Sequence, residues 1–492
     1  MAGAGSDIFK VDDLEELLPP AAFLEGSGSL DAALDAAAGV VASLGSDSNS
    51  LDDVREALRR LLLSRPDVVP EPLALLRTIR RWALQGLRDD RTLLDDVLLA
   101  APLESPELSD PTAASASFPH SQKASRVATA AQARNLLANA FLGNCRDIVA
   151  KHKDPWSRGG LDFTRLLMDN PPHRSSLGQA RLQCLLAYFE TRRQVEGTED
   201  DDRKIAFERV RFVPLDPNKI EDFGRRLPDG LPAAGRYVGQ GVRIHDSPME
   251  EPLVNSGTAP SSIAFVNFAN ANYGYGKFIA SCTQEEILLS CCPELAVGMA
   301  FLGKMYPDEV VNVRNVRRYA KYSGYLGTFR CEGPVSASCT ASPLQTVLTM
   351  DACTSAHFTR SGVARDVSKA YYAFREHVRT STSTPVAVST GKWGCGVFGG
   401  VSAHKFLQQI LAAYLAGVDE LAFSRFGSDA GCSELLVALE GSQATSADVF
   451  ALLRACTDRR NFVRDAKAFL SREGEDRPDS CKTAESSIVD IV

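Results

Sequence analysis

The sequence predicts an α/β fold with a mixed sheet, preceded by an α-helical region. From about residue 205 onward, short β-branched or aromatic runs alternate with segments whose apolar residues have helical spacing, which is typical of α/β proteins. Before that point, the clear apolar patterns have helical spacing. Since α/β sheets bind ligands at the carboxyl ends of their strands, functional residues are expected at those ends.

The N-terminal part of the chain is expected to be helical. Within residues 1–110, the apolar spacing predicts helices over Leu51–Leu63 and Leu73–Leu84, which three intervening prolines keep apart. Residues 111–125 are rich in Pro, Ser and Ala and are expected to form an exposed linker. A second helical region follows over 126–205, and a generic helical bundle would explain its periodicity equally well.

Residues 206–470 are expected to form the α/β domain, and the charged segment 471–492 is expected to be a disordered tail. The expected strands cover Ile205–Phe212, Gly241–Ile244, Ser262–Asn267, Val310–Val313, Val347–Met350, Pro385–Ser389 and Glu420–Phe423. The expected helices cover Glu285–Leu302, Val367–Arg379, Ala403–Ala416, Ser433–Glu440 and Ala447–Thr457.

Composition limits the class of protein. The formal net charge of −8 over 492 residues argues against a nonspecific nucleic-acid binder, although a local basic patch could bind another polyanion. The sequence has no membrane-spanning apolar run and no secretory leader pattern, so a nuclear or cytoplasmic location is expected. The 12 cysteines and seven histidines lack the spacing of metal ligands, so neither a metal nor a cofactor is expected.

The segment Asn267–Glu286 is the main candidate for function. It leads from an expected strand through a glycine-bearing loop to a helix start that carries Glu285 and Glu286. Loop amides and a helix N-terminus can face a diphosphate while the carboxylates contact a sugar. The segment from Thr283 to Glu286 also has the form of a capping box, which would explain the acidic residues without any ligand.

Three ordered blocks resemble the poly(ADP-ribose) glycohydrolase family. The first runs from Val266 through Gly274, Gln284 and Glu286 to Pro293-Glu294-Leu295, without a gap between Asn267 and Glu286. The other two are Tyr322–Arg330 and Thr390–Gly400. The resemblance implies a macrodomain-like fold, an α-helical accessory region before it, and the hydrolysis of ribose–ribose O-glycosidic bonds that releases ADP-ribose.

The same resemblance assigns site residues. It implies Glu286 as the acid/base, Glu285 as the ligand of the neighbouring ribose hydroxyls, and Asn267 at the place of a family aspartate. The implied substrate-binding residues are Asn270, Gly274, Tyr275, Gly276, Gln284, Tyr325, Gly394, Cys395, Gly396, Val397, Phe398, Gly399 and Phe426. The implied partners are poly(ADP-ribose) or ADP-ribosylated proteins, in the setting of the DNA damage response, with no membrane and no direct sequence-specific nucleic-acid binding.

The chain departs from the family pattern at several positions. Asn267 replaces an aspartate, Tyr275 replaces the middle glycine of a triplet, and Lys392 and Val401 replace the usual Asn and Asp. Three hypotheses follow: a glycohydrolase, a catalytically weakened protein that binds ADP-ribose or its polymer, or a helical scaffold with a decayed α/β domain. Glu251 is a further candidate for an adenine-binding glutamate.

Overall fold

The computed structural model describes residues 29–44, 50–88, 103–107, 121–145, 161, 163–168, 175–216, 236–250, 262–274, 282–335, 343–382 and 384–472. None of the helices in these ranges is both long and apolar enough to cross a membrane. Of the tail expected over 471–492, all residues after Arg472 lie outside the described residues.

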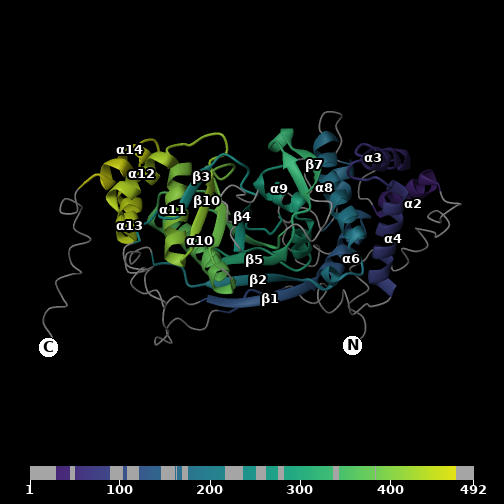
Figure 1. Ribbon diagram of the computed structural model, residues 1–492, viewed down its shortest axis with the longest axis horizontal. Helices are drawn as coiled ribbons and strands as arrows, with labels where there is room; N and C mark the ends of the chain where they lie inside the picture. The colour runs from purple at the N-terminus through teal and green to yellow at the C-terminus, as the bar shows by residue number, and fades with distance from the viewer. Residues whose placement is uncertain are drawn as a thin grey trace.

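An eight-stranded mixed sheet forms the centre of the molecule (Figure 1). Its strands are β1 (Ser121–Thr129), β2 (Lys204–Phe212), β3 (Val242–His245), β4 (Ser262–Ala269), β5 (Glu309–Val316), β8 (Gln345–Asp351), β9 (Val386–Thr390) and β10 (Glu420–Ser424). Their spatial order is β1-β2-β5-β8-β4-β9-β10-β3. The first three pairings in this order are antiparallel, and the strands from β8 to β3 run parallel.

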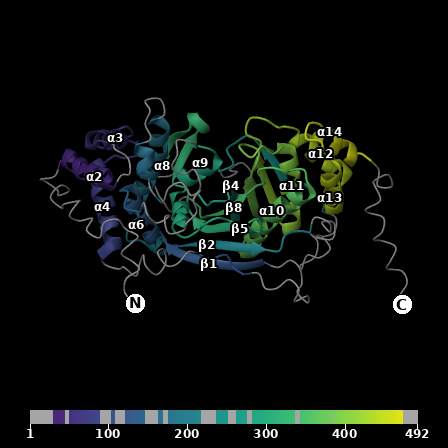
Figure 2. The ribbon, with the colours of Figure 1, turned by 180° about the vertical axis from the view of Figure 1, so that it is seen from behind.

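Helices cover both faces of this sheet. The helices are α2 (Leu30–Leu44), α3 (Leu51–Leu63), α4 (Pro72–Arg88), α6 (Ala130–Phe141), α7 (Thr164–Met168), α8 (Ser175–Gln194), α9 (Gln284–Cys291), α10 (Arg360–Thr380), α11 (Ser402–Ala416), α12 (Cys432–Ser442), α13 (Ser446–Ala455) and α14 (Phe462–Leu470). Helices α10 to α14 lie on one side, and α9 with the N-terminal helices lies on the other (Figures 1 and 2). Neighbouring strand residues alternate between the two cores, because side chains point to opposite faces: Val310 faces the first and Val311 the second.

The α/β prediction is confirmed, and every expected strand overlaps an observed one. The structure adds β1, a two-stranded ribbon of β6 (Ala320–Ser323) and β7 (Arg330–Pro334), and α14. Strand β1 pairs with β2 along its whole length, so residues 121–125 of the expected linker belong to the sheet. Its polar, alternately exposed residues gave no buried apolar run, which is why the sequence pattern missed it.

The expected helix Glu285–Leu302 is wrong in its second half. Helix α9 ends at Cys291, and Pro293–Ala300 forms a 3-10 helix instead. Proline lacks the backbone N–H and its ring clashes with the preceding turn, so Pro293 cannot continue the α-helix. Helix α11 begins at Ser402, one residue before the expected start at Ala403, and Val401 is its N-cap.

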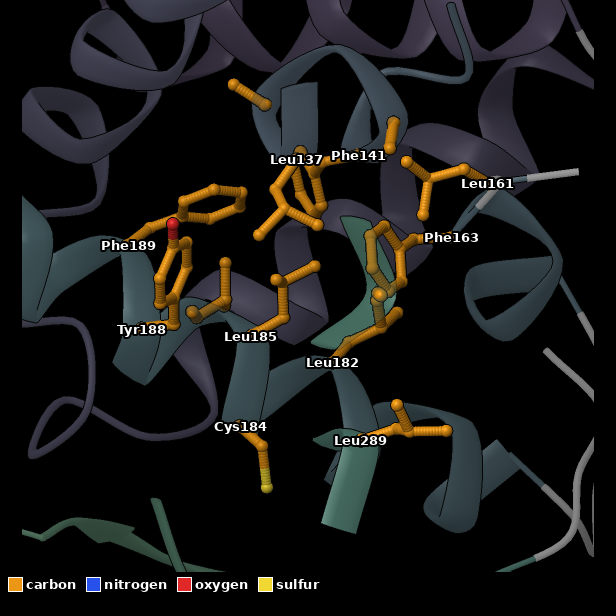
Figure 3. Packing of buried hydrophobic residues seen from close by; sticks show 14 of the residues in the cluster. Leu137, Phe141, Leu161, Phe163, Leu182, Cys184, Leu185, Tyr188, Phe189 and Leu289 are labelled. Carbon is orange, nitrogen blue, oxygen red and sulfur yellow. The ribbon is translucent and has the colours of Figure 1, made fainter. Parts of the chain in front are cut away.

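Helix α8 is the centre of the helical region. The side chains of Leu182, Leu185 and Phe189 are buried. Figure 3 shows them near Leu137 and Phe141 of α6, and Leu289 of α9 belongs to the same hydrophobic cluster. The ring of Phe189 lies 5.8 Å from that of Phe141 and 6.1 Å from that of Trp82. Helices α6, α8 and α9 therefore share one hydrophobic core.

Buried charges also join this region to the sheet. The Arg203 guanidinium donates to Glu294, with a shortest distance of 2.5 Å, and forms an ion pair with Asp200 at 3.1 Å. Asp200 also forms ion pairs with Arg192 and Arg317. Glu294 is fully buried, and it directly precedes Leu295 of the 3-10 helix after α9. Removal of one member would leave an uncompensated charge in the interior.

Two buried histidines predict that stability falls in mild acid. Burial lowers the pKa of His404 to about 3 and that of His377 to about 4, whereas an unfolded histidine titrates near pH 6.5. Between the folded and unfolded pKa values, the unfolded chain binds more protons than the folded chain does. The contribution of the two histidines to stability is therefore complete above pH 6.5 and is lost progressively below it. The expected loss at pH 5 is about 2 kcal/mol for each histidine.

Melting temperatures measured between pH 7.5 and pH 5 check this expectation. His404 stacks on Phe358 with ring centroids 4.1 Å apart, so His404→Phe retains an aromatic ring while it removes the titrating group. That variant is expected to melt with a shallower pH dependence than the native protein. A melting temperature that stays constant from pH 7.5 to 5 would contradict the prediction.

Candidate ligand-binding site

A cavity of about 750 Å³ opens at the carboxyl ends of four neighbouring parallel strands. Residues that follow each strand line it: Asn270 after β4, Gly391 after β9, Phe426 after β10 and Glu250 after β3. Because these strands are parallel, their carboxyl ends meet at one edge of the sheet. The size lies within the range of small-molecule sites.

The start of α9 supplies the acidic wall. Glu285 and Glu286 line the cavity, and each is only 5% exposed. Oε2 of Glu286 accepts a hydrogen bond from the Thr283 amide at 2.7 Å, while Oε2 of Glu285 accepts one from the Asn270 amide at 3.2 Å. The capping interaction expected from the sequence is therefore present, and the same carboxylate faces the cavity. Capping and a ligand-binding role are compatible here.

Gln284 holds this wall to the sheet. Its Oε1 accepts from the Phe268 amide at 2.7 Å, and its Nε2 donates to the Val266 carbonyl at 3.1 Å and to Glu250 at 3.0 Å. The predicted residue thus lines the cavity and also fixes the angle between α9 and β4. The side-chain amide of Gln284 both accepts and donates hydrogen bonds in this position. A glutamate carboxylate can only accept them, so it could not replace Gln284.

Glu250 is a third buried carboxylate that the sequence analysis did not identify. It is 3% exposed and accepts from the Tyr322 hydroxyl at 2.6 Å. Burial, and then the charge of Glu250, raises the pKa of Tyr322, so that hydroxyl stays a donor. The candidate named from the sequence was the adjacent Glu251, which lies outside the described residues. The position directly after β3 was the available signal, because the cavity lies at that end of the sheet.

The loop between β9 and α11 forms another wall. Of the residues that the resemblance implied as substrate-binding, Gly394, Cys395, Gly396, Val397 and Phe398 line the cavity. Gly394 has φ 70°, and a Cβ there would lie 2.5 Å from the Cβ of Ala352, so only glycine fits without strain. Gly399 belongs to the same loop but does not line the cavity.

Aromatic rings cover the mouth of the cavity. Tyr325 extends from the turn between β6 and β7, and Phe426 follows β10; their ring centroids are 5.4 Å apart. Burial, and then the charge of Glu286, raises the pKa of the Tyr325 hydroxyl. Phe426 is 47% exposed and has φ 34°, an uncommon backbone conformation for a bulky residue. An exposed ring held in this way is suited to stacking on a planar group.

Besides Gly399, the predicted positions Asn267 and Gly274 do not line the cavity within the described residues. Asn267 is 2% exposed and donates from Nδ2 to Thr349 Oγ1 at 3.4 Å, between β4 and β8. It alternates with Phe268, which does line the cavity, so its side chain points to the other face of the sheet. Gly274 has φ 74° but also lies outside the lining. Tyr275 and Gly276 lie outside the described residues.

The fold and the cavity define an α/β ligand-binding domain with an acidic wall and a glycine-rich wall. Comparison with known proteins supports the resemblance seen in the motifs. Residues 255–432 match the family model described as poly(ADP-ribose) glycohydrolase, macro domain fold. This match covers part of the chain, and over that part the resemblance is confirmed.

Individual relatives are distant. The chain is 27% identical over 346 residues to poly(ADP-ribose) glycohydrolase 1 of Arabidopsis thaliana. This alignment covers 55% of this chain and 58% of the relative. It is 26% identical over 210 residues to poly(ADP-ribose) glycohydrolase 1 of Caenorhabditis elegans, covering 38% of this chain and 26% of the relative. The crystal structure of the glycohydrolase from Thermomonospora curvata aligns with 16% identity and a TM-score of 0.29, over 54% of this chain and 98% of that one.

Proposed function

We propose that this protein is a glycosidase that hydrolyses the ribose–ribose bonds of poly(ADP-ribose) and releases ADP-ribose. The observation that carries the proposal is that Glu285 and Glu286 line the same cavity as the glycine-rich loop. Carboxylates accept hydrogen bonds from sugar hydroxyls, and loop amides donate to phosphate oxygens. A ligand that carries both groups, such as ADP-ribose, suits the two walls.

Hydrolysis of the glycosidic bond requires one proton donor near the departing oxygen. In the proposed reaction, Glu286 protonates that oxygen as the bond to the anomeric carbon breaks, and the carbon develops oxocarbenium character. The resulting carboxylate then takes a proton from the water that attacks the same carbon. Glu285 binds the hydroxyls of the adjacent ribose, and Phe426 stacks on the adenine or on a ribose.

The test is incubation of the full chain with poly(ADP-ribose) labelled in its adenine, with the released ADP-ribose separated from polymer by chromatography. We expect time-dependent release that the Glu286→Gln variant does not support. Release at the same rate from both proteins would exclude the proposed role of Glu286, and no release from the native protein would exclude the glycohydrolase.

A second candidate function is a protein that binds ADP-ribose or its polymer without cleaving it. The replacement of the family aspartate by Asn267 favours this alternative, because an amide in place of the aspartate removes a carboxylate. Calorimetry with ADP-ribose distinguishes the candidates when it is read beside the release assay. A binding protein gives heat without product, and a scaffold gives neither.

A further inference from the structure

The cavity has an uneven distribution of charge. Among the lining residues in the described part of the chain, the acidic side chains are Glu250, Glu285 and Glu286, and Lys392 is the only cationic one. The carboxylates lie on α9 and after β3, whereas Lys392 follows β9 at the start of the glycine-rich loop. Lys392 is therefore the cationic side chain that the described part of this wall presents to the cavity.

The backbone fixes where Lys392 stands. It follows Gly391, where an added Cβ would lie 2.9 Å from the Ser424 carbonyl oxygen, so the end of β9 packs closely on the end of β10. The Lys392 ammonium donates to the Phe426 carbonyl at 3.3 Å. This contact places the charge beside the backbone of Phe426, and an ammonium group has two further protons to donate.

Lys392 differs from the buried lysines of the same domain. Lys369 forms an ion pair with Asp351, and Lys405 forms one with Asp366. Within the described residues, no carboxylate lies within ion-pair distance of Lys392, and its ammonium donates to the neutral Phe426 carbonyl. An ammonium group at a cavity wall without a carboxylate partner is suited to an anion that arrives with the ligand.

We propose that Lys392 binds a phosphate oxygen of the ligand and makes this site selective for ligands with an anionic phosphate. This proposal rests on the proposed function and specifies it. A nucleoside diphosphate sugar would lie across the cavity, with its phosphates at Lys392 and the loop amides and its sugar hydroxyls at the three carboxylates. The family usually has an asparagine at this place, so the added charge is a property of this chain.

Calorimetry with ADP-ribose at about 50 mM and about 300 mM salt tests the proposal on the full chain. We expect Lys392→Met to weaken binding about tenfold at the lower salt concentration, the loss of one charge-assisted hydrogen bond. The variant should also lose less affinity than the native protein as salt rises, because one charge contact is missing. Lys392→Arg should retain most of the affinity.

Lys467→Met is the matched control. Lys467 lies on α14, is 45% exposed and pairs with Glu434, and it does not line the cavity. The Lys467→Met variant is expected to leave both the affinity for ADP-ribose and the salt dependence of that affinity unchanged. Equal affinity of the native protein and Lys392→Met would overturn the proposal, and so would a loss that is the same at both salt concentrations or that arginine fails to rescue. Absence of ADP-ribose binding by the native protein would instead refute the proposed function itself.

Discussion

Replacement of Glu286 by glutamine is expected to lower the rate of ADP-ribose release by about 10²- to 10⁴-fold, the usual contribution of a general acid. An amide has no proton to give to the departing ribose oxygen. Its oxygen can still accept the hydrogen bond that the Thr283 amide donates to Glu286, so the start of α9 should remain intact. Affinity for ADP-ribose should therefore change little while turnover is lost.

The measurement is the initial rate of product release from labelled polymer, with calorimetric affinity for ADP-ribose recorded on the same samples. Glu434→Gln is the matched control, because Glu434 also stands in the first turn of a helix but is 58% exposed and does not line the cavity. If Glu286 served only to cap α9, its glutamine variant would cleave polymer at the rate of this control. That outcome would contradict the acid/base role.

Replacement of Arg203 by methionine is expected to lower the free energy of unfolding by about 3–5 kcal/mol. Glu294 is fully buried, and the variant would leave it with the Tyr319 hydroxyl and the Arg317 amide as donors but without its ion-pair partner. Asp200 would keep its ion pairs with Arg192 and Arg317. Most of the cost therefore comes from the unpaired charge on Glu294.

Urea denaturation followed by tryptophan fluorescence checks this loss, since Trp82 packs in the helical region and Trp393 beside the cavity. Lys467→Met removes one side of an exposed ion pair, and it is expected to change stability by no more than about 1 kcal/mol. A transition for Arg203→Met that coincides with that of Lys467→Met would show that the buried pair contributes nothing beyond an exposed one.

The domain limits drawn from the sequence stay predictions, but the structure shows why a sharp limit near residue 205 is difficult to place. Strand β1 starts at Ser121 and completes the sheet, while α6 and α8 lie between it and β2 in the chain. The helical region is thus inserted between two paired strands. Arg203 and Asp200, just before β2, join it to Glu294 and Arg317 of the α/β part.

The sequence by itself determined the elements whose residues carry a repeating pattern. Buried apolar runs such as the one at β4 and helical spacing such as that of α8 are local properties. The α/β class followed from them, and with it the expectation that ligands bind at the carboxyl ends of the strands. The motif around Glu286 was also local, because its residues are close in the chain. Strand β1 was missed because its stability comes from pairing with β2, about eighty residues away in the chain.

Only the tertiary structure decided which polar residues face the cavity. Glu250, Lys392 and Phe426 come from three different strand ends, and their proximity depends on the order of β9, β10 and β3 in the sheet. The same alternation of side chains that exposes Phe268 to the cavity turns Asn267 away from it. A motif shows which residue types are present, but strand order and side-chain direction determine which of them can touch one ligand.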